Sequence, residues 1–379
     1  MTASVLWRVW NPIFLTFSLA VVVSLNNYVR MALPRLLAPD SVAHPVYHCY
    51  SRIVDRRFIF GPAEKNHFLK ILRCYERLCG LKLLTYCLMD NHFHILVEVP
   101  RRPVNLPSES ELRVLIEETL GPKSAQAFAD LMERWREQNN TTAITQELER
   151  WYARMWDLGR FMKMVKQRFS CWYNRRQPEP RTGTLWEARY RSTLVECSEA
   201  LQAMAFYVDL NPVRAGLVSD PMNYRWCGYA AATAGVRQAQ EGLTRMAELA
   251  SAAFAQRQKE ETASWTADIL AWYRQVLYTK GEERKTPDGE VVRIGFSGAQ
   301  IDAVHDAQGN LPLSRYLLHR VRYVTCGAIL GTKEFVDAVF QERRSWFSPQ
   351  RRSGARRLKG LARDCPLRCA RDLTRHPYG

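Results

Sequence analysis

The amino-acid sequence predicts an α+β fold in which helices pack on an antiparallel sheet. Short segments rich in β-branched and aromatic residues, typical of strands, alternate with longer segments whose apolar residues recur every three or four positions, as in amphipathic helices. Two strand segments are separated by only three residues, Met-Asp-Asn, which indicates a hairpin turn. The resulting order of strand, helix, two strands, helix and strand is the ferredoxin-like βαββαβ arrangement.

The first half of this core contains three strands and one helix. We expect the strands over 45–53, 81–88 and 92–99. The apolar spacing predicts a helix over 63–79, which Gly80 ends.

The second half of the core begins with a long insertion. Residues 104–157 are charged and low in turn signals, which predicts one or two inserted helices. A basic amphipathic helix is expected over 158–176, followed by a short strand over 192–197. Ser198 can cap a last helix that runs to about Leu210.

The length of the chain suits one sizeable domain and a smaller appendage. We expect the main domain over 31–235, a helical connector over 236–280, a basic accessory region that is a candidate for DNA binding over 281–360, and a tail over 361–379. Residues 1–30 contain an apolar run shorter than the ~20 residues that span a bilayer. We therefore expect a mis-assigned start or an unstructured extension there and no membrane partner, with a membrane anchor as the alternative.

The charge balance of the chain favours a polyanionic partner. Lys and Arg number 54 against 38 Asp and Glu, a net charge of +16, and nucleic acid is the commonest partner of such a protein. A basic protein with no such partner is the alternative. The ten cysteines are scattered as in a cytoplasmic protein with reduced thiols, and Cys365 and Cys369 lack the further ligands of a zinc site.

The first candidate site is the sequence His92-Phe93-His94. On a strand, the first and third side chains project from the same face, so two imidazoles can share one divalent metal ion. Two ordinary histidines on a half-exposed strand have the same spacing, so the pair alone does not define a metal site.

The second candidate site is Tyr207 with Asn211, four residues apart and so on one face of a helix. A phenol titrates near ~10 and needs electrostatic help to attack phosphorus, which a metal that polarises the phosphate supplies. Pro212 can turn Asn211 away from the helix, and a core tyrosine is the alternative for Tyr207. Tyr173, on the basic helix over 158–176, is a rival nucleophile.

The third candidate site is a surface where cations alternate with aromatic residues. Cations contact phosphates and aromatic rings stack on unpaired bases. A solvated helix with an aromatic core stripe is the alternative. The residues assigned to DNA binding are Lys163, Lys166, Arg168, Arg175, Arg176, Trp186, Arg189 and Arg191.

Four segments in order resemble the REP-associated tyrosine transposases, a branch of the single-tyrosine HUH transposase superfamily. They are MDNHFHILVEVP, GRFMKMVKQRFSCWYNRR, GTLWEARYRSTLVE and YVDLNPVRAGLV. The resemblance covers roughly residues 44–230 and implies the ferredoxin-like fold. It implies that His92, His94 and Asn211 bind a divalent metal, Mg or Mn, and that Tyr207 is the nucleophile.

The same resemblance implies a substrate and a reaction. The substrate is single-stranded or hairpin DNA from palindromic repeats, cleaved through a 5′-phosphotyrosine intermediate that leaves a 3′-hydroxyl. No small-molecule substrate is implied, and the chain can be a monomer or a homodimer. The alternative is a regulator, derived from a transposase, that binds repeat DNA or RNA without cleaving it.

Overall fold

The computed structural model of the chain describes residues 35–218, 220–251, 273, 284–285, 291–293, 328–358 and 365–371. The chain divides into two units, Met1–Arg35 and Leu36–Gly379, and every element below belongs to the second. The expected extension over 1–30 lies outside the described residues.

Seven of the described strands form one sheet in the order β2-β3-β1-β4-β7-β9-β8. All neighbouring strands are antiparallel except β4 and β7, which are parallel. The bounds are β1 Val46–Arg52, β2 Lys82–Leu88, β3 His92–Glu98, β4 Arg191–Val195, β7 Ile329–Gly331, β8 Arg356–Arg357 and β9 Arg368–Cys369. A separate pair consists of β5 Arg284–Lys285 and β6 Val291–Arg293. The α+β prediction and its βαββ start are confirmed, since β1 to β4 occur where the sequence predicts strands.

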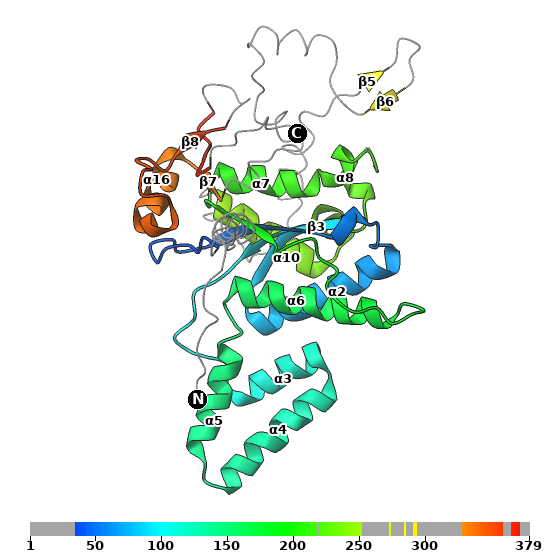
Figure 1. Cartoon of the computed structure of the whole chain (residues 1–379), viewed down its shortest axis with the longest axis vertical. Coiled ribbons are helices and arrows are strands. Elements are labelled where there is room, and N and C mark those ends of the chain that lie inside the picture. Colours follow the sequence, from blue (N-terminus) through cyan, green and yellow to red (C-terminus); the bar gives the residue numbers. More distant parts are fainter. Residues whose placement is uncertain are drawn as a thin grey trace, which may run out of the picture. The chain divides into compact units, whose positions relative to one another are not determined.

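Helices cover both faces of this sheet (Figure 1). One face packs on α2, Pro62–Cys79, and α6, Leu158–Arg175; Phe93 of β3 lies 4.8 Å from Phe68 of α2, ring centre to ring centre. The other face packs on α7, Glu199–Asp209, whose Asp209 carboxylate accepts a hydrogen bond from Thr85 of β2. Alternate residues of β3 therefore point into two different environments.

The insertion forms three helices rather than the one or two that the sequence predicts. These are α3 Glu109–Leu120, α4 Pro122–Glu137 and α5 Thr141–Tyr152. Gly121, with a φ of 92°, separates the first two, and Asn140 caps the third. The sequence contains turn-forming pairs at both helix boundaries, Gly-Pro and Asn-Asn. Each pair is only two residues long, so the charged, helix-like pattern on either side continues across it.

The last helices of the main domain follow α7 closely. They are α8 Asn211–Arg214, α9 Gly228–Thr233 and α10 Arg237–Ala250, with short 3₁₀ turns at Val54–Arg56 and Pro221–Asn223. At Gly242 of α10 an added Cβ would lie 2.4 Å from the Leu83 carbonyl oxygen, so this helix packs on β2 without room for a side chain. Beyond Ser251, most of the expected connector over 236–280 lies outside the described residues.

The C-terminal part differs from the expected separate accessory region. β7 pairs with β4 of the main sheet, and α16, Lys333–Glu342, packs beside it, followed by a 3₁₀ turn at Arg344–Trp346. Part of the expected tail forms β9, which also joins this sheet. The described part of 281–379 that carries these elements thus continues the main sheet instead of standing apart from it.

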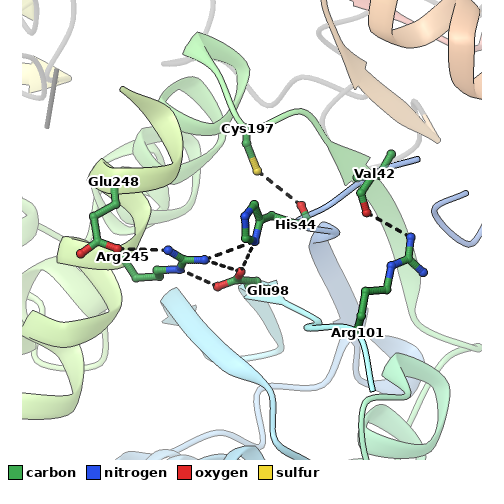
Figure 2. A network of polar contacts seen from close by, with 7 residues as sticks. All are labelled: Val42, His44, Glu98, Arg101, Cys197, Arg245 and Glu248. Atoms are coloured by element: carbon green, nitrogen blue, oxygen red, sulfur yellow. Dashed lines mark hydrogen bonds and ion pairs between the residues drawn. The ribbon is translucent and has the colours of Figure 1, made fainter. Parts of the chain in front are cut away.

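A network of ion pairs links the end of β3 to α10 (Figure 2). Arg245 donates to both carboxylate oxygens of Glu98, at 2.9 and 2.8 Å, and to Glu248 at 3.1 Å. His44 lies 3.1 Å from the same Glu98 carboxylate, and the Cys197 thiol donates to the His44 carbonyl oxygen. Glu98 is 2% exposed, so this network fixes a buried charge at the edge of the core.

No helix among the described residues is long and apolar enough to cross a membrane.

Candidate active site

The two histidines of the His92-Phe93-His94 sequence lie on the α7 face of the sheet. Their ring centres are 5.2 Å apart, and their side chains are 7% and 2% exposed. Phe93 points to the opposite face, where it packs on Phe68 and Trp186. The alternation that the sequence predicts for this strand is therefore present, with both imidazoles on the side that α7 covers.

Each of these histidines is oriented through its Nδ1 atom. Asn91 Oδ1 lies 2.7 Å from His92 Nδ1, and His48 Nε2 lies 2.9 Å from His94 Nδ1. A histidine that ligates a metal through Nε2 commonly has its other ring nitrogen held in this way, because the hydrogen bond fixes the tautomer and the ring plane. The contacts therefore suit Nε2 of both rings to metal ligation.

Tyr207 comes from α7 and lies beside the His94 and His48 rings. Its ring centre lies 5.7 Å from that of His94 and 5.9 Å from that of His48, both edge to face. The Arg214 guanidinium lies 4.0 Å from the centre of the Tyr207 ring and donates to the Tyr207 carbonyl oxygen at 2.6 Å. A fixed positive charge thus adjoins the phenol, whose side chain is only 1% exposed.

Asn211 remains close to Tyr207 in spite of the proline that follows it. Leu210 keeps helical dihedral angles and α8 begins at Asn211, with Pro212 in its first turn, where proline is tolerated. The Asn211 amide nitrogen donates to the carbonyl oxygens of Tyr207 and Val208, both at 3.0 Å. Its Oδ1 is the atom with which it could ligate a cation.

Two imidazole nitrogens and one amide oxygen form a set of metal ligands. Such a set suits a divalent cation that accepts both nitrogen and oxygen ligands better than one that binds oxygen ligands alone. Within the described ranges no group of three or more His, Cys, Asp or Glu side chains could hold a metal ion.

Three residues that the sequence analysis did not select belong to this site. His48 and Tyr50 of β1 alternate on the strand as His92 and His94 do, and the Tyr50 ring lies 4.9 Å from that of His94. Arg214 contacts Tyr207, as described above. The alternation was visible in the sequence, but only the register, which pairs Tyr50 with His94, brings β1 and β3 together here.

The residues assigned to DNA binding separate into two groups. Lys166 and Trp186 are buried, and both donate inward: Lys166 Nζ to the Ala188 carbonyl oxygen, and Trp186 Nε1 to Ser170. These two side chains therefore hold α6 to the following loop and have little surface to offer DNA. The exposed ones are Lys163, Arg168, Arg175, Arg176, Arg189 and Arg191.

Tyr173, the rival nucleophile, lies on α6. Its ring is 6.2 Å from Phe169, which packs on Phe68 and Phe60 beneath the sheet. The helix of Tyr173 therefore covers the face opposite to the histidine pair, whereas the helix of Tyr207 covers the same face.

Comparison with known proteins gives the class of this domain. Residues 41–105 match the family model described as "Transposase IS200 like". The match includes β1, α2, β2 and β3, and with them His48, His92 and His94. The chain therefore contains an IS200-like transposase domain.

One matching solved structure is described as "Structure of the REP associates tyrosine transposase bound to a REP hairpin"; it is 10% identical, with a TM-score of 0.34 over 54% of this chain and 86% of that one. No curated protein matches the chain.

Proposed function

We propose that this chain is a metal-dependent single-tyrosine transposase that cleaves and rejoins single-stranded or hairpin DNA of palindromic repeats. The observation that supports it most directly is the approach of Tyr207, on α7, to the His94 ring on β3. Two segments 113 residues apart in sequence (207 − 94) thus bring a phenol beside paired imidazoles. The matched transposase domain supports the same assignment.

In the proposed step the Tyr207 hydroxyl oxygen attacks the scissile phosphorus. A bond forms between the phenol oxygen and phosphorus, and the bond from phosphorus to the 3′-oxygen breaks. The phenol gives up its proton, and the leaving oxygen takes one up as a 3′-hydroxyl, so the tyrosine ester conserves the phosphodiester for rejoining. A divalent metal bound by His92, His94 and Asn211 would polarise the phosphate and stabilise its developing charge.

The remaining side chains have supporting roles in this proposal. Asn91 and His48 hold the planes of the two imidazoles. Arg214 lies next to the Tyr207 ring, so its positive charge would stabilise negative charge that develops on the phenol oxygen. The Mg or Mn preference, like the repeat sequence of the substrate, follows from the motif resemblance alone.

The assignment is tested by incubating the protein, with Mg²⁺ or Mn²⁺, with a hairpin that carries a single-stranded flank. We expect a covalent protein–DNA adduct, visible as a shifted band on a denaturing gel. Tyr207→Phe should abolish the adduct and retain hairpin binding, while Tyr173→Phe, on the other face of the sheet, should retain both. Adduct formation by the Tyr207→Phe protein would refute the assignment.

The burial of Tyr207 favours a second candidate, a regulator that binds repeat DNA or RNA without cleaving it. A phenol that is 1% exposed reaches a phosphate only after the groups that cover it move. Hairpin binding that is independent of metal, with no adduct from the unaltered protein, would favour this candidate.

A further inference from the structure

A cavity of about 610 Å³ opens between α2, α6 and the end of α3, where the insertion meets the core. α2 and α6 cover the face of the sheet that carries Phe93, so this cavity lies on the opposite side from the histidine pair. The mechanism proposed above uses none of its residues. α3, which supplies one wall, is held to α2 by a hydrogen bond from Thr119 to the Cys74 carbonyl oxygen.

Four cations line the wall formed by α2 and α6. They are Lys70, Arg168, Arg175 and Arg176, all exposed. None of the four forms an ion pair with a carboxylate of the described chain. Exposed cations with no carboxylate partner create a positive potential that attracts anions.

The pKa of His67, in the same wall, reports that potential. It is lowered from its ordinary value by burial and then by the positive charges of Lys70, Arg168 and Arg176. Three of the four cations, Lys70, Arg168 and Arg176, therefore lie close enough to His67 to act on its charge.

The facing wall, at the end of α3, carries two carboxylates, Glu117 and Glu118. Glu118 pairs with Arg77 at 3.1 Å, so its charge is already partly neutralised. Four cations against two carboxylates leave a net positive cavity, and the two acidic side chains direct an anion toward the α2 and α6 wall.

An aromatic ledge borders these cations. The His67 and Trp172 rings are stacked, with centres 3.8 Å apart and planes inclined by 16°, and the Arg176 guanidinium lies 5.1 Å from the Trp172 ring. A ledge of stacked rings next to guanidinium groups offers apolar contact to a sugar or base while the cations contact its phosphate.

We propose that this cavity binds the sugar-phosphate backbone of a single-stranded DNA segment that flanks the cleaved hairpin. This proposal rests on the proposed function, which supplies the DNA substrate. It adds a second region of DNA contact, on the face of the sheet opposite to Tyr207. The cavity lies within the volume range of small-ligand sites, about 300–1,000 Å³.

Cys171 provides a direct probe of occupancy. It lines the cavity and is the exposed cysteine among those that the structure describes. The Tyr207→Phe protein, which cannot cleave, is treated with a thiol-alkylating reagent, and the modified peptide is followed by mass spectrometry. We expect a flanked hairpin to slow alkylation of Cys171 several-fold and a blunt hairpin of the same stem to leave it unchanged.

A charge-matched pair of variants tests the contact energetically. Arg168→Ala with Arg175→Ala removes two cations from the cavity, and Arg134→Ala with Arg160→Ala removes two exposed cations of α4 and α6 that lie outside it. For the cavity variant we expect weaker binding of the flanked hairpin. The slope of log K against log salt concentration should be shallower by about 1.4, because each of the two lost phosphate contacts contributes about 0.7. The control variant should keep the slope of the parent protein.

The outcomes separate this proposal from the proposed function. Cys171 alkylation that is equally fast with and without the flanked hairpin, or an unchanged salt slope in the cavity variant, would overturn the cavity assignment even if the parent protein forms an adduct. Protection of Cys171 together with a reduced slope would support the cavity even if no adduct forms, in which case the chain is a binder alone.

Discussion

At the scale of single residues, the site depends on hydrogen bonds that orient rings. His48 is 1% exposed and contacts His94 through its Nε2 atom, so the His94 ring plane is set by a partner on the neighbouring strand. Removing a partner of this kind typically lowers metal affinity by about 10- to 100-fold, because the ligand loses its fixed tautomer and orientation.

We therefore expect His48→Phe, which keeps a ring but has no nitrogen, to weaken Mn²⁺ binding by about 10- to 100-fold. His48→Gln should restore part of the affinity, because its amide can still exchange a hydrogen bond with His94 Nδ1. Isothermal titration with Mn²⁺ measures both variants, and their thermal unfolding reports any loss of packing. Equal Mn²⁺ affinity in the parent and the phenylalanine variant would exclude this orienting role.

At the scale of elements, the Glu98 network joins β3 to α10 (Figure 2). Burial alone would raise the pKa of Glu98, but the hydrogen bonds and positive charge of Arg245, with smaller contributions from Lys82 and His44, hold it below the ordinary value of 4.5. A carboxyl group whose pKa is lowered by folding stabilises the folded state above its ordinary pKa. That contribution is lost as the pH falls through the lowered value.

Arg245→Met should therefore lower the free energy of unfolding at neutral pH by about 3 kcal/mol, because it removes the guanidinium that pairs with both oxygens of a buried carboxylate. The difference from the parent protein should shrink as the pH falls below 4.5 and through the lowered pKa of Glu98, because the carboxyl of the parent then becomes protonated as well. Urea unfolding at several pH values measures it.

The control for this element is Arg237→Met. Arg237 pairs with Glu241 on the surface, with side chains 88% and 59% exposed, so its loss should cost at most about 1 kcal/mol. A pH-independent difference for Arg245→Met would show that lost packing, not the ion pair, accounts for its effect.

At the scale of the whole molecule, the C-terminal elements extend the sheet that carries the histidine pair. β7 lies parallel to β4, and Phe340 of α16 is 1% exposed in the core beside it. If these elements share one core with the domain, a defect in α16 destabilises the whole unit and not a separate module.

Phe340→Ala should lower the free energy of unfolding by about 3–5 kcal/mol, the usual cost of emptying a buried aromatic site. Because the elements share a sheet, scanning calorimetry should show the main transition moving as a whole. Phe58→Ala, which truncates a side chain that is 79% exposed, should leave that transition nearly in place. A small independent transition that moves alone would contradict a shared core.

The core of the fold followed from local pattern. The strands at β1 to β4 and the helices α2, α6 and α7 lie within a few residues of the predicted bounds, because alternation and apolar spacing are properties of neighbouring residues. The joining of β7, β8 and β9 to the sheet could not be predicted in the same way. Each has only two or three residues, too few for a period to be visible, and their pairing depends on partners far away in the chain.

The sequence by itself determined the order of the core elements, the placement of His92 and His94 on one face of a strand, and the spacing of Tyr207 from Asn211. Those are consequences of the two-residue repeat of a strand and the 3.6-residue repeat of a helix. Only the tertiary structure decided that Tyr207 meets His94, that His48 supports that ring, and that Trp186 and Lys166 lie inside. Each of these depends on strand register or on the packing of distant segments, which side-chain volume and hydrogen bonding settle after the elements have formed.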